Sequence, residues 1–186
     1  MKKITLVLGV LFSLLIISCE GPEGPPGFDG ENGVDGIQGQ VFEVNGIDFT
    51  YNSDDNLYET IITYINYTNF EVLKQDAILV YRFDGTVPLN DGADVDSWGL
   101  IPQNFFLPEG TMQYVSSHTL VDVQILIDGN FNLASLSSDF TQNQIFRIVI
   151  IPSEFASSGK MDTSNISSVM NSLGIQEKDV HKIILD

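Results

Sequence analysis

Cysteine and basic residues are both scarce in this chain. Cys19 is the only cysteine among 186 residues, and 8 lysines and arginines face 25 aspartates and glutamates, which gives a net charge of −17. A single cysteine forms no internal disulfide, so thiol-pair redox chemistry and cysteine metal clusters are excluded. The negative charge repels nucleic acid, which we therefore exclude as a partner.

The chain also lacks recognisable catalytic motifs. Its two histidines, His118 and His181, belong to no nucleophile motif such as G-x-S-x-G. We find no H-E-x-x-H, no phosphate loop and no dinucleotide-binding glycine pattern after a strand. A carboxylate pair for glycoside hydrolysis is conceivable, but the spacing selects no two of the 25 acidic residues. We therefore expect a protein that is not an enzyme, with no catalytic residues and no cofactor.

The N-terminal residues have the organisation of an export signal. Lys2 and Lys3 precede an apolar stretch over residues 4–17, which is followed by Ser18 and Cys19. A basic start, an apolar segment and a small residue at the cleavage site are typical of a secretory signal. The apolar stretch is about 14 residues long, shorter than the roughly 20 that a spanning helix needs. The alternatives are a signal peptide with an incidental cysteine and an N-terminal membrane anchor.

Residues 15–19, Leu-Ile-Ile-Ser-Cys, resemble a bacterial lipobox, in which the cysteine takes a diacylglycerol and becomes the first residue of the mature chain. We therefore predict a lipoprotein signal peptide over residues 1–18 and lipidation at Cys19. Removal of the signal, which carries two lysines and no acid, changes the net charge from −17 to −19.

A glycine occurs at every third position after Cys19. The glycines in phase are Gly21, Gly24, Gly27, Gly30, Gly33, Gly36 and Gly39. This period is the signature of a collagen-type tract, since only glycine fits the axis of a triple helix. Residues 19–40 are thus either a trimerising segment or an extended spacer. We favour the spacer, because several acidic side chains would be brought together from three chains without a basic partner. About 20 extended residues reach roughly 60 Å.

The remaining residues, 41–186, predict one mainly β domain. We expect a strand, or a hairpin turning at Asn45-Gly46, over residues 41–49, followed by six further strands. The strand at 119–127 presents one apolar face that runs from Thr119 and Val121 to Ile127. Short strands separated by turn signals indicate a single antiparallel, immunoglobulin-like β-sandwich. The expected strands cover 57–67, 77–83 (ended by Asp84-Gly85), 98–107 (broken by Pro102), 119–127, 144–151 and 180–185.

One short helix is expected near the C-terminus. Ile166, Val169, Met170 and Leu173 recur with helical spacing, residues 162–164 offer capping side chains, and Gly174 stands where a helix C′ glycine belongs. We expect the apolar face of this helix to pack on the sheet.

Two groups of residues are candidates for binding. Asp91, Asp94 and Asp96 lie in a predicted acidic loop over residues 90–96 that supplies oxygen ligands for calcium but does not match the EF-hand spacing. A solvated loop without metal is the alternative that we favour. Aromatic side chains could line a glycan platform, although in a β-sandwich they more often belong to the core. The aromatic candidates are Tyr58, Tyr64, Tyr67, Trp98, Phe105 and Phe106.

The chain resembles the lipoproteins of Bacteroidota, chiefly flavobacteria, that combine a lipobox, a short Gly-X-Y tract and one β-rich domain. The matching segments are residues 24–30, 98–103, 123–128 and 139–152. The resemblance implies an outer-membrane lipid anchor, facing either the periplasm or the cell surface, and brings no known reaction or ligand. We expect a structural or binding role in the cell envelope. The alternatives are a homotrimeric adhesin-like assembly and a calcium- or glycan-binding module, and the protein or glycan partner stays open.

Overall fold

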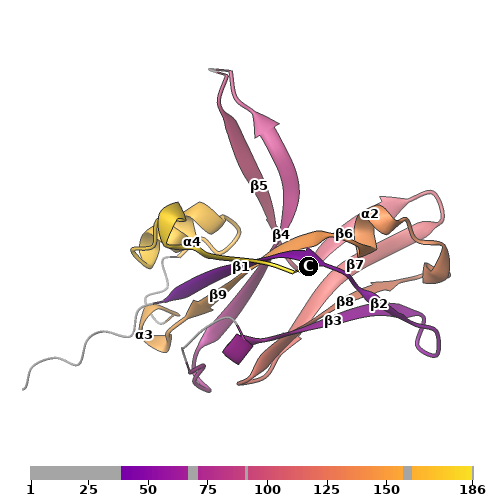
Figure 1. Ribbon diagram of the computed structural model, residues 1–186, viewed down its shortest axis with the longest axis horizontal. Helices are drawn as coiled ribbons and strands as arrows, with labels where there is room; N and C mark the ends of the chain where they lie inside the picture. Colours follow the sequence, from indigo (N-terminus) through magenta and orange to yellow (C-terminus); the bar gives the residue numbers. More distant parts are fainter. Residues whose placement is uncertain (1–38, 67–70, 91, 157–160, 186) are drawn as a thin grey trace, which may run out of the picture. The chain divides into compact units, whose positions relative to one another are not determined.

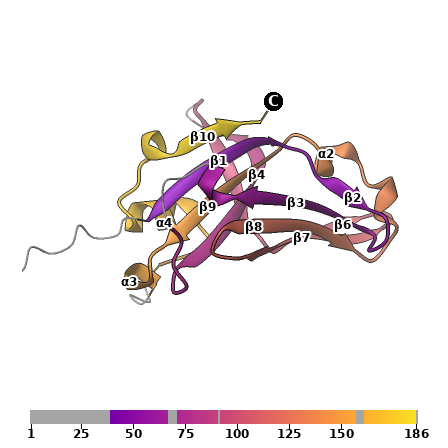
Figure 2. The same cartoon turned by 60° about the horizontal axis from the view of Figure 1, so that its bottom comes forward.

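Two β-sheets, each of five strands, contain all the strands of the described residues and pack face to face (Figures 1 and 2). The computed structural model describes residues 39–66, 71–90, 92–156 and 161–185. The predicted signal peptide, Cys19 and the glycines of the Gly-X-Y tract before Gly39 lie outside these residues. The predicted mainly β architecture is confirmed, and the first strand begins at Gln40, one residue before the expected start of the domain.

Sheet 1 has the strand order β10-β1-β9-β4-β5. Its strands pair antiparallel except at one edge, where β10 runs parallel to β1. The antiparallel expectation is therefore wrong for this pair. Strand β10 begins at the end of the sheet where β9 stops, so it runs antiparallel to β9 and therefore parallel to β1, which lies between them. The strands are β1 (Gln40–Ile47), β4 (Ala77–Pro88), β5 (Asp94–Leu100), β9 (Gln144–Ile151) and β10 (His181–Ile184).

Sheet 2 has the strand order β2-β3-β8-β7-β6, and all its pairs are antiparallel. Short 3-10 segments and a single-turn helix connect the two sheets. The strands are β2 (Thr50–Asn52), β3 (Leu57–Thr63), β6 (Gln103–Leu107), β7 (Gly110–His118) and β8 (Asp122–Gly129). The connecting segments are η2 (Tyr64–Asn66), η3 (Leu133–Ser135) and α2 (Ser138–Thr141), whereas α3 (Ser153–Ala156) lies between β9 and β10 of sheet 1.

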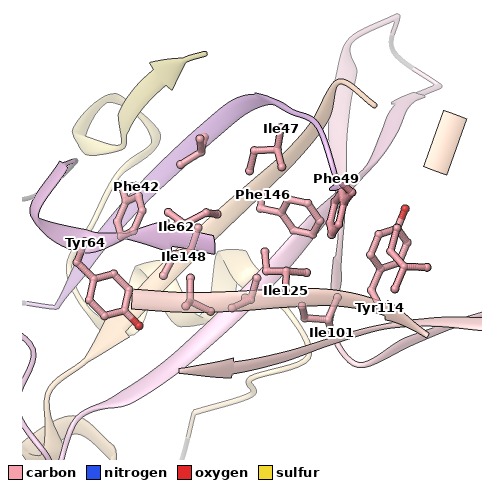
Figure 3. Close-up of a cluster of buried hydrophobic side chains, with 14 of the residues drawn as sticks. Phe42, Ile47, Phe49, Ile62, Tyr64, Ile101, Tyr114, Ile125, Phe146 and Ile148 are labelled. Atoms are coloured by element: carbon pink, nitrogen blue, oxygen red, sulfur yellow. The ribbon is translucent and has the colours of Figure 1, made fainter. Parts of the chain in front are cut away.

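The space between the sheets is filled by apolar and aromatic side chains, which we call the inner core (Figure 3). Alternate residues of each strand point inward, as period-two geometry requires. Sheet 1 supplies Phe42, Phe146 and Ile148, and sheet 2 supplies Met112 and Ile125. Each fully buried apolar side chain stabilises the fold by roughly 1.5–3 kcal/mol.

The central strand of sheet 1, β9, is buried on both faces. Phe146, Ile148 and Ile150 belong to the inner core, while Val149 and Ile151 point to the other face. There they pack against helix α4 (Ile166–Ser172), which lies over sheet 1 as a third layer (Figure 1). We call this second cluster the outer core. It comprises Val41, Tyr81, Val149, Ile151, Ile166, Val169, Met170, Leu173 and Val180.

Several expected strand limits are wrong, each for a local reason. Asn45-Gly46 makes no hairpin, since β1 continues through a register shift with Gly46 at a φ of 80°. Gly85 does not end β4, because a bulge between Phe83 and Gly85 lets the strand run on to Pro88. Strand β7 was not expected at all.

Strand β8 begins at Asp122, three residues after the start expected for the strand at 119–127. Thr119 forms a turn with Asp122, which places Val121 on the surface instead of on the apolar face. The expected strand at 57–67 ends at Thr63, where η2 begins. In contrast, β9 has the limits that the sequence predicted.

Candidate functional site

A cavity of about 520 Å³ lies on the outer face of sheet 1, between β5, helix α4 and the short segment η4 (Glu177–Asp179). It adjoins the outer core, so its walls come from two layers of the fold. Such a volume is within the range of known ligand pockets. The cavity is lined by Asp94, Val95, Asp96, Trp98, Arg147, Ile166, Ser167, Met170, Asn171, Ile175, Gln176 and Glu177.

Strand β5 forms the first wall. Because side chains alternate along a strand, Asp94, Asp96 and Trp98 share the face that lines the cavity. Asp96 accepts a hydrogen bond from the Thr86 hydroxyl at 3.4 Å, and Phe83 lies against the Trp98 ring with the centroids 5.3 Å apart. This wall is acidic at its outer end and aromatic at its inner end.

Helix α4 forms the second wall, and its ends are fixed by local sequence. The Asn165 side chain accepts a hydrogen bond from the Ser168 N–H at the N-cap, and Gly174 follows the helix with a φ of 70°. The predicted helix and its C′ glycine are confirmed, but the capping residue is Asn165 and not residues 162–164. The apolar face packs on the sheet as expected, and Ser167 and Asn171 line the cavity.

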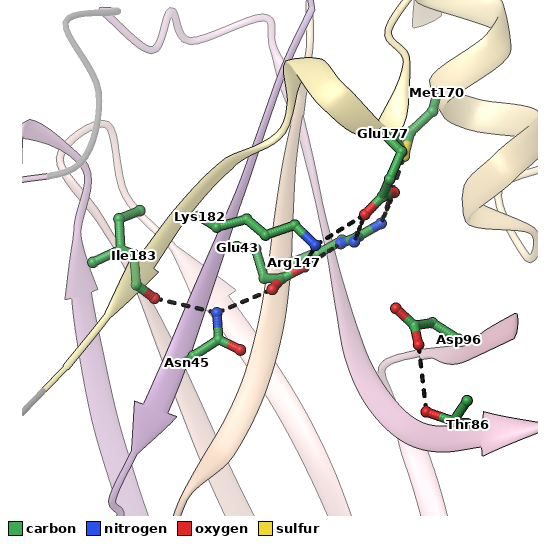
Figure 4. A network of polar contacts seen from close by, with 9 residues as sticks. All are labelled: Glu43, Asn45, Thr86, Asp96, Arg147, Met170, Glu177, Lys182 and Ile183. Atoms are coloured by element: carbon green, nitrogen blue, oxygen red, sulfur yellow. Dashed lines mark hydrogen bonds and ion pairs between the residues drawn. The ribbon is translucent and has the colours of Figure 1, made fainter. Parts of the chain in front are cut away.

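Arg147 forms the floor of the cavity and is only 2% exposed. Its Nε donates to Glu43 at 2.8 Å, its Nη1 donates to Glu177 at 2.8 Å, and its Nη2 forms a further ion pair with Glu177 (Figure 4). The guanidinium carbon also lies 4.1 Å from the centroid of the Trp98 ring. Glu177 is therefore a bidentate partner of Arg147. Together with Glu43 and Trp98 it fixes the position of the guanidinium group.

Lys182 of β10 completes this network on the same face. Its ammonium lies 3.1 Å from Glu177 and 3.5 Å from Glu43. Burial alone would raise the pKa of Glu177, but hydrogen bonds from Arg147 and Lys182 outweigh it and hold the pKa below its ordinary value of 4.5. The two cations and two carboxylates balance one another, so the network contributes no net charge to the cavity.

Two of the three calcium candidates lie on a strand and not in a loop. Asp94 and Asp96 lie on strand β5, which begins within the predicted loop 90–96, and Asp91 lies outside the described residues. Within the part of the chain that the structure describes, no group of three or more histidine, cysteine, aspartate or glutamate side chains could hold a metal ion.

The aromatic candidates for a glycan platform do not share one surface. Tyr64 and Phe105 pack in or against the inner core, and the Tyr58 ring lies against Tyr51 on sheet 2, with the centroids 4.9 Å apart and the rings tilted by 45°. Phe106 is 84% exposed on edge strand β6, and Tyr67 lies outside the described residues. Of the five that the structure describes, only Trp98 lines the cavity.

Four charged residues of the site were missed in the sequence, namely Glu43, Arg147, Glu177 and Lys182. The first two do carry a signal, because each is a charged residue inside an apolar strand, in Val-Phe-Glu-Val and in Ile-Phe-Arg-Ile-Val. Charged residues are rarely buried unless they are paired. Their position therefore predicts a partner, although not which one.

No family model, curated protein or solved structure matches this chain. The described residues also include no helix of the length and apolar character needed to cross a bilayer.

Proposed function

We propose that this protein is a lipid-anchored component of the bacterial cell envelope whose β-sandwich acts as a non-catalytic binding domain. The observation that carries the anchor is the position of Cys19 directly after Ser18 at the end of an apolar leader. We further propose an immunoglobulin-like sandwich and kinship with the Gly-X-Y lipoproteins of Bacteroidota. An outer-membrane location follows from that kinship, with the domain on either side of the membrane.

The binding role is supported by the cavity on sheet 1. Its floor is a rigid network in which Arg147 is held by Glu43, Glu177 and Trp98. A pre-formed pocket lined by a few fixed polar groups is the usual setting for recognition. The Gly-X-Y tract would hold this pocket roughly 60 Å from the membrane if extended.

Lipid labelling of the full chain in a bacterial host tests the anchor. We expect labelled fatty acid on the wild-type protein, and mass spectrometry should find diacylglycerol on Cys19 as the N-terminal residue. The Cys19→Ser variant should take up no label and should leave the membrane fraction. An unmodified thiol on Cys19, or a leader retained on the mature chain, would refute the anchor.

A homotrimer is the second candidate, and the seven glycines in phase favour it. Lipid anchoring of neighbouring chains would raise their local concentration. Sedimentation of the lipidated protein in detergent separates the two cases. A spacer gives a monomer without a collagen-type circular dichroism signal. A triple helix gives a trimer that Gly30→Ala disrupts and that the control Asp29→Ala preserves.

A further inference from the structure

Strand β5 is an edge strand of sheet 1. It pairs with β4 on one side and has no neighbouring strand on the other side within the described residues. The β4–β5 hairpin also projects away from the sandwich, as Figure 1 shows. A free edge presents unpaired backbone N–H and C=O groups that can accept an added strand. The cavity lies against the side-chain face of this same strand.

The face of β5 that lines the cavity carries negative charge that is not neutralised. Asp94 and Asp96 are exposed, and neither forms an ion pair with a basic side chain of the described residues. The nearby cations, Arg147 and Lys182, form their ion pairs with Glu43 and Glu177 instead. The net charge of −17 adds to the negative potential here.

The opposite wall of the cavity is mixed. Its apolar part comes from Ile166, Met170 and Ile175, which lie beside the polar side chains of Ser167, Asn171 and Gln176. Lysine and arginine side chains place an apolar stem on such a surface while the charged group reaches a carboxylate. The cavity therefore suits a long basic side chain better than a compact cation.

Two other occupants fit less well. A second copy of this acidic chain would bring like charges onto the same edge, which destabilises strand pairing. A sugar would need an open aromatic face, but the Trp98 ring already contacts the Arg147 guanidinium at 4.1 Å and Phe83 at 5.3 Å. Charge complementarity favours a foreign basic strand.

We propose that β5 binds a basic peptide segment of a partner protein as an added strand, with alternate lysine or arginine side chains opposite Asp94 and Asp96. A residue two positions further along would lie beside Trp98, where an apolar side chain fits. The proposal depends on the proposed binding role and gives it a ligand class.

Trp98 is the only tryptophan of the chain, so its fluorescence reports on the cavity without a label. We would titrate the full chain, purified in non-ionic detergent, with a short peptide that alternates lysine and threonine. We expect a saturable change in Trp98 fluorescence and slower amide hydrogen exchange over residues 94–97. A peptide with glutamate in place of lysine should not bind.

Two matched controls test the geometry. Asp94→Asn and Asp96→Asn should each weaken binding roughly two- to fivefold, as expected for a cross-strand charge pair. Asp128→Asn, which removes an exposed carboxylate from sheet 2, should leave the affinity unchanged. A peptide with the same lysines but proline in place of threonine should lose binding, because proline donates no ladder hydrogen bond.

The proposal is overturned if the proline peptide or spermidine binds as tightly as the lysine–threonine peptide, because strand pairing would then play no part. Equal losses for Asp128→Asn and Asp96→Asn would also overturn it, as would preferential binding of the glutamate peptide. These results are independent of the lipid-labelling experiment, so failure of the ligand class is distinguishable from failure of the anchor.

Discussion

Sheet 1 buries its inner face against sheet 2 and its outer face against α4, and the two faces contain different side chains. The inner core consists of apolar and aromatic groups such as Phe49, Tyr114 and Phe146, whose rings meet edge to face at 6.0–6.1 Å between centroids. The outer core stands beside a buried ion network and a cavity of about 520 Å³. The inner face is therefore filled by packed side chains, while the outer face combines packing with an open cavity.

The difference originates in what covers each face. Sheet 2 covers the inner face except at the projecting end of the β4–β5 hairpin, so side chains from both sheets fill the space between them closely. The seven-residue helix α4 covers only part of the outer face. Arg147 lies at the edge of the area that the helix covers, with its Nη1 4.0 Å from Met170 Sδ, and its charged group is enclosed by Glu177 and Trp98. If the two faces contribute differently to stability, substitutions on them should change the free energy of unfolding to different extents.

The largest effect is expected from Arg147→Ala. It leaves the Glu43 carboxylate, whose side chain is only 7% exposed, with Lys182 at 3.5 Å as its basic partner. Removal of one partner of a buried pair costs about 3–5 kcal/mol. Urea unfolding should show this loss.

Two comparisons control for the charge change. Lys182→Ala removes an exposed cation from the same network and should cost at most about 1 kcal/mol. The double variant Glu43→Met with Arg147→Met should recover most of the stability, because apolar residues of similar volume replace the pair. A cost below about 1 kcal/mol for Arg147→Ala would mean that the network adds little to the outer face.

A smaller effect is expected from two matched methionine substitutions, one on each face. Met112 is fully buried in the inner core, and Met170 is 6% exposed at the wall of the cavity. Methionine to alanine costs about 2–5 kcal/mol, and the cost rises with the volume of the void that remains. Met112→Ala should lie near the middle of this range, and Met170→Ala near its lower end, because the space that Met170 leaves is continuous with the cavity. Equal losses in urea unfolding would contradict the distinction between the two faces.

The inner core was largely foreseeable from sequence, and the outer core only in part. Period-two apolar residues such as Val123 and Ile125 predict a face buried in a sandwich, and the helical spacing of Ile166, Val169 and Met170 predicts a packed helix. The limits of β4 could not be foreseen, because a bulge at Gly85 carries the strand past a turn signal.

The candidate site was not foreseeable, because its residues are far apart in sequence. Glu43 and Arg147 are 104 residues apart, and the antiparallel register of β1 and β9 places them opposite each other. Glu177 reaches this pair from η4, the short segment between α4 and β10. The apolar residues around Arg147 predict that it has a charged partner. Which residue is the partner depends on the order of the strands in the sheet.

A loss of about 1 kcal/mol is expected when the N-cap of α4 is removed, since capping side chains contribute about that amount. In Asn165→Ala the Ser168 N–H loses the side-chain oxygen that accepts its hydrogen bond at 3.1 Å. Hydrogen exchange should become faster over α4 and stay unchanged in β7, because the helix covers only the outer face. Asn165→Ser keeps a capping oxygen and should restore the protection. Faster exchange in both regions would show that the two faces unfold together.

The smallest effect on stability is expected from a fall in pH, and it arises from a carboxylate on the outer face. The folded-state pKa of Glu177 is depressed by the hydrogen bonds from Arg147 and Lys182. The stabilisation from this carboxylate is thus present above its unfolded-state pKa of about 4.5 and is lost as the pH falls through the lower folded value. The effect is small because the side chain is 58% exposed and solvent screens the pair. Unfolding measured from pH 7 to 3 should show a steeper decline for the wild type than for Glu177→Gln, which cannot titrate at this position. Asp128→Asn is the matched control and should decline as the wild type does. If Glu177→Gln and the wild type declined in parallel, the network on the outer face would not be coupled to the titration of Glu177.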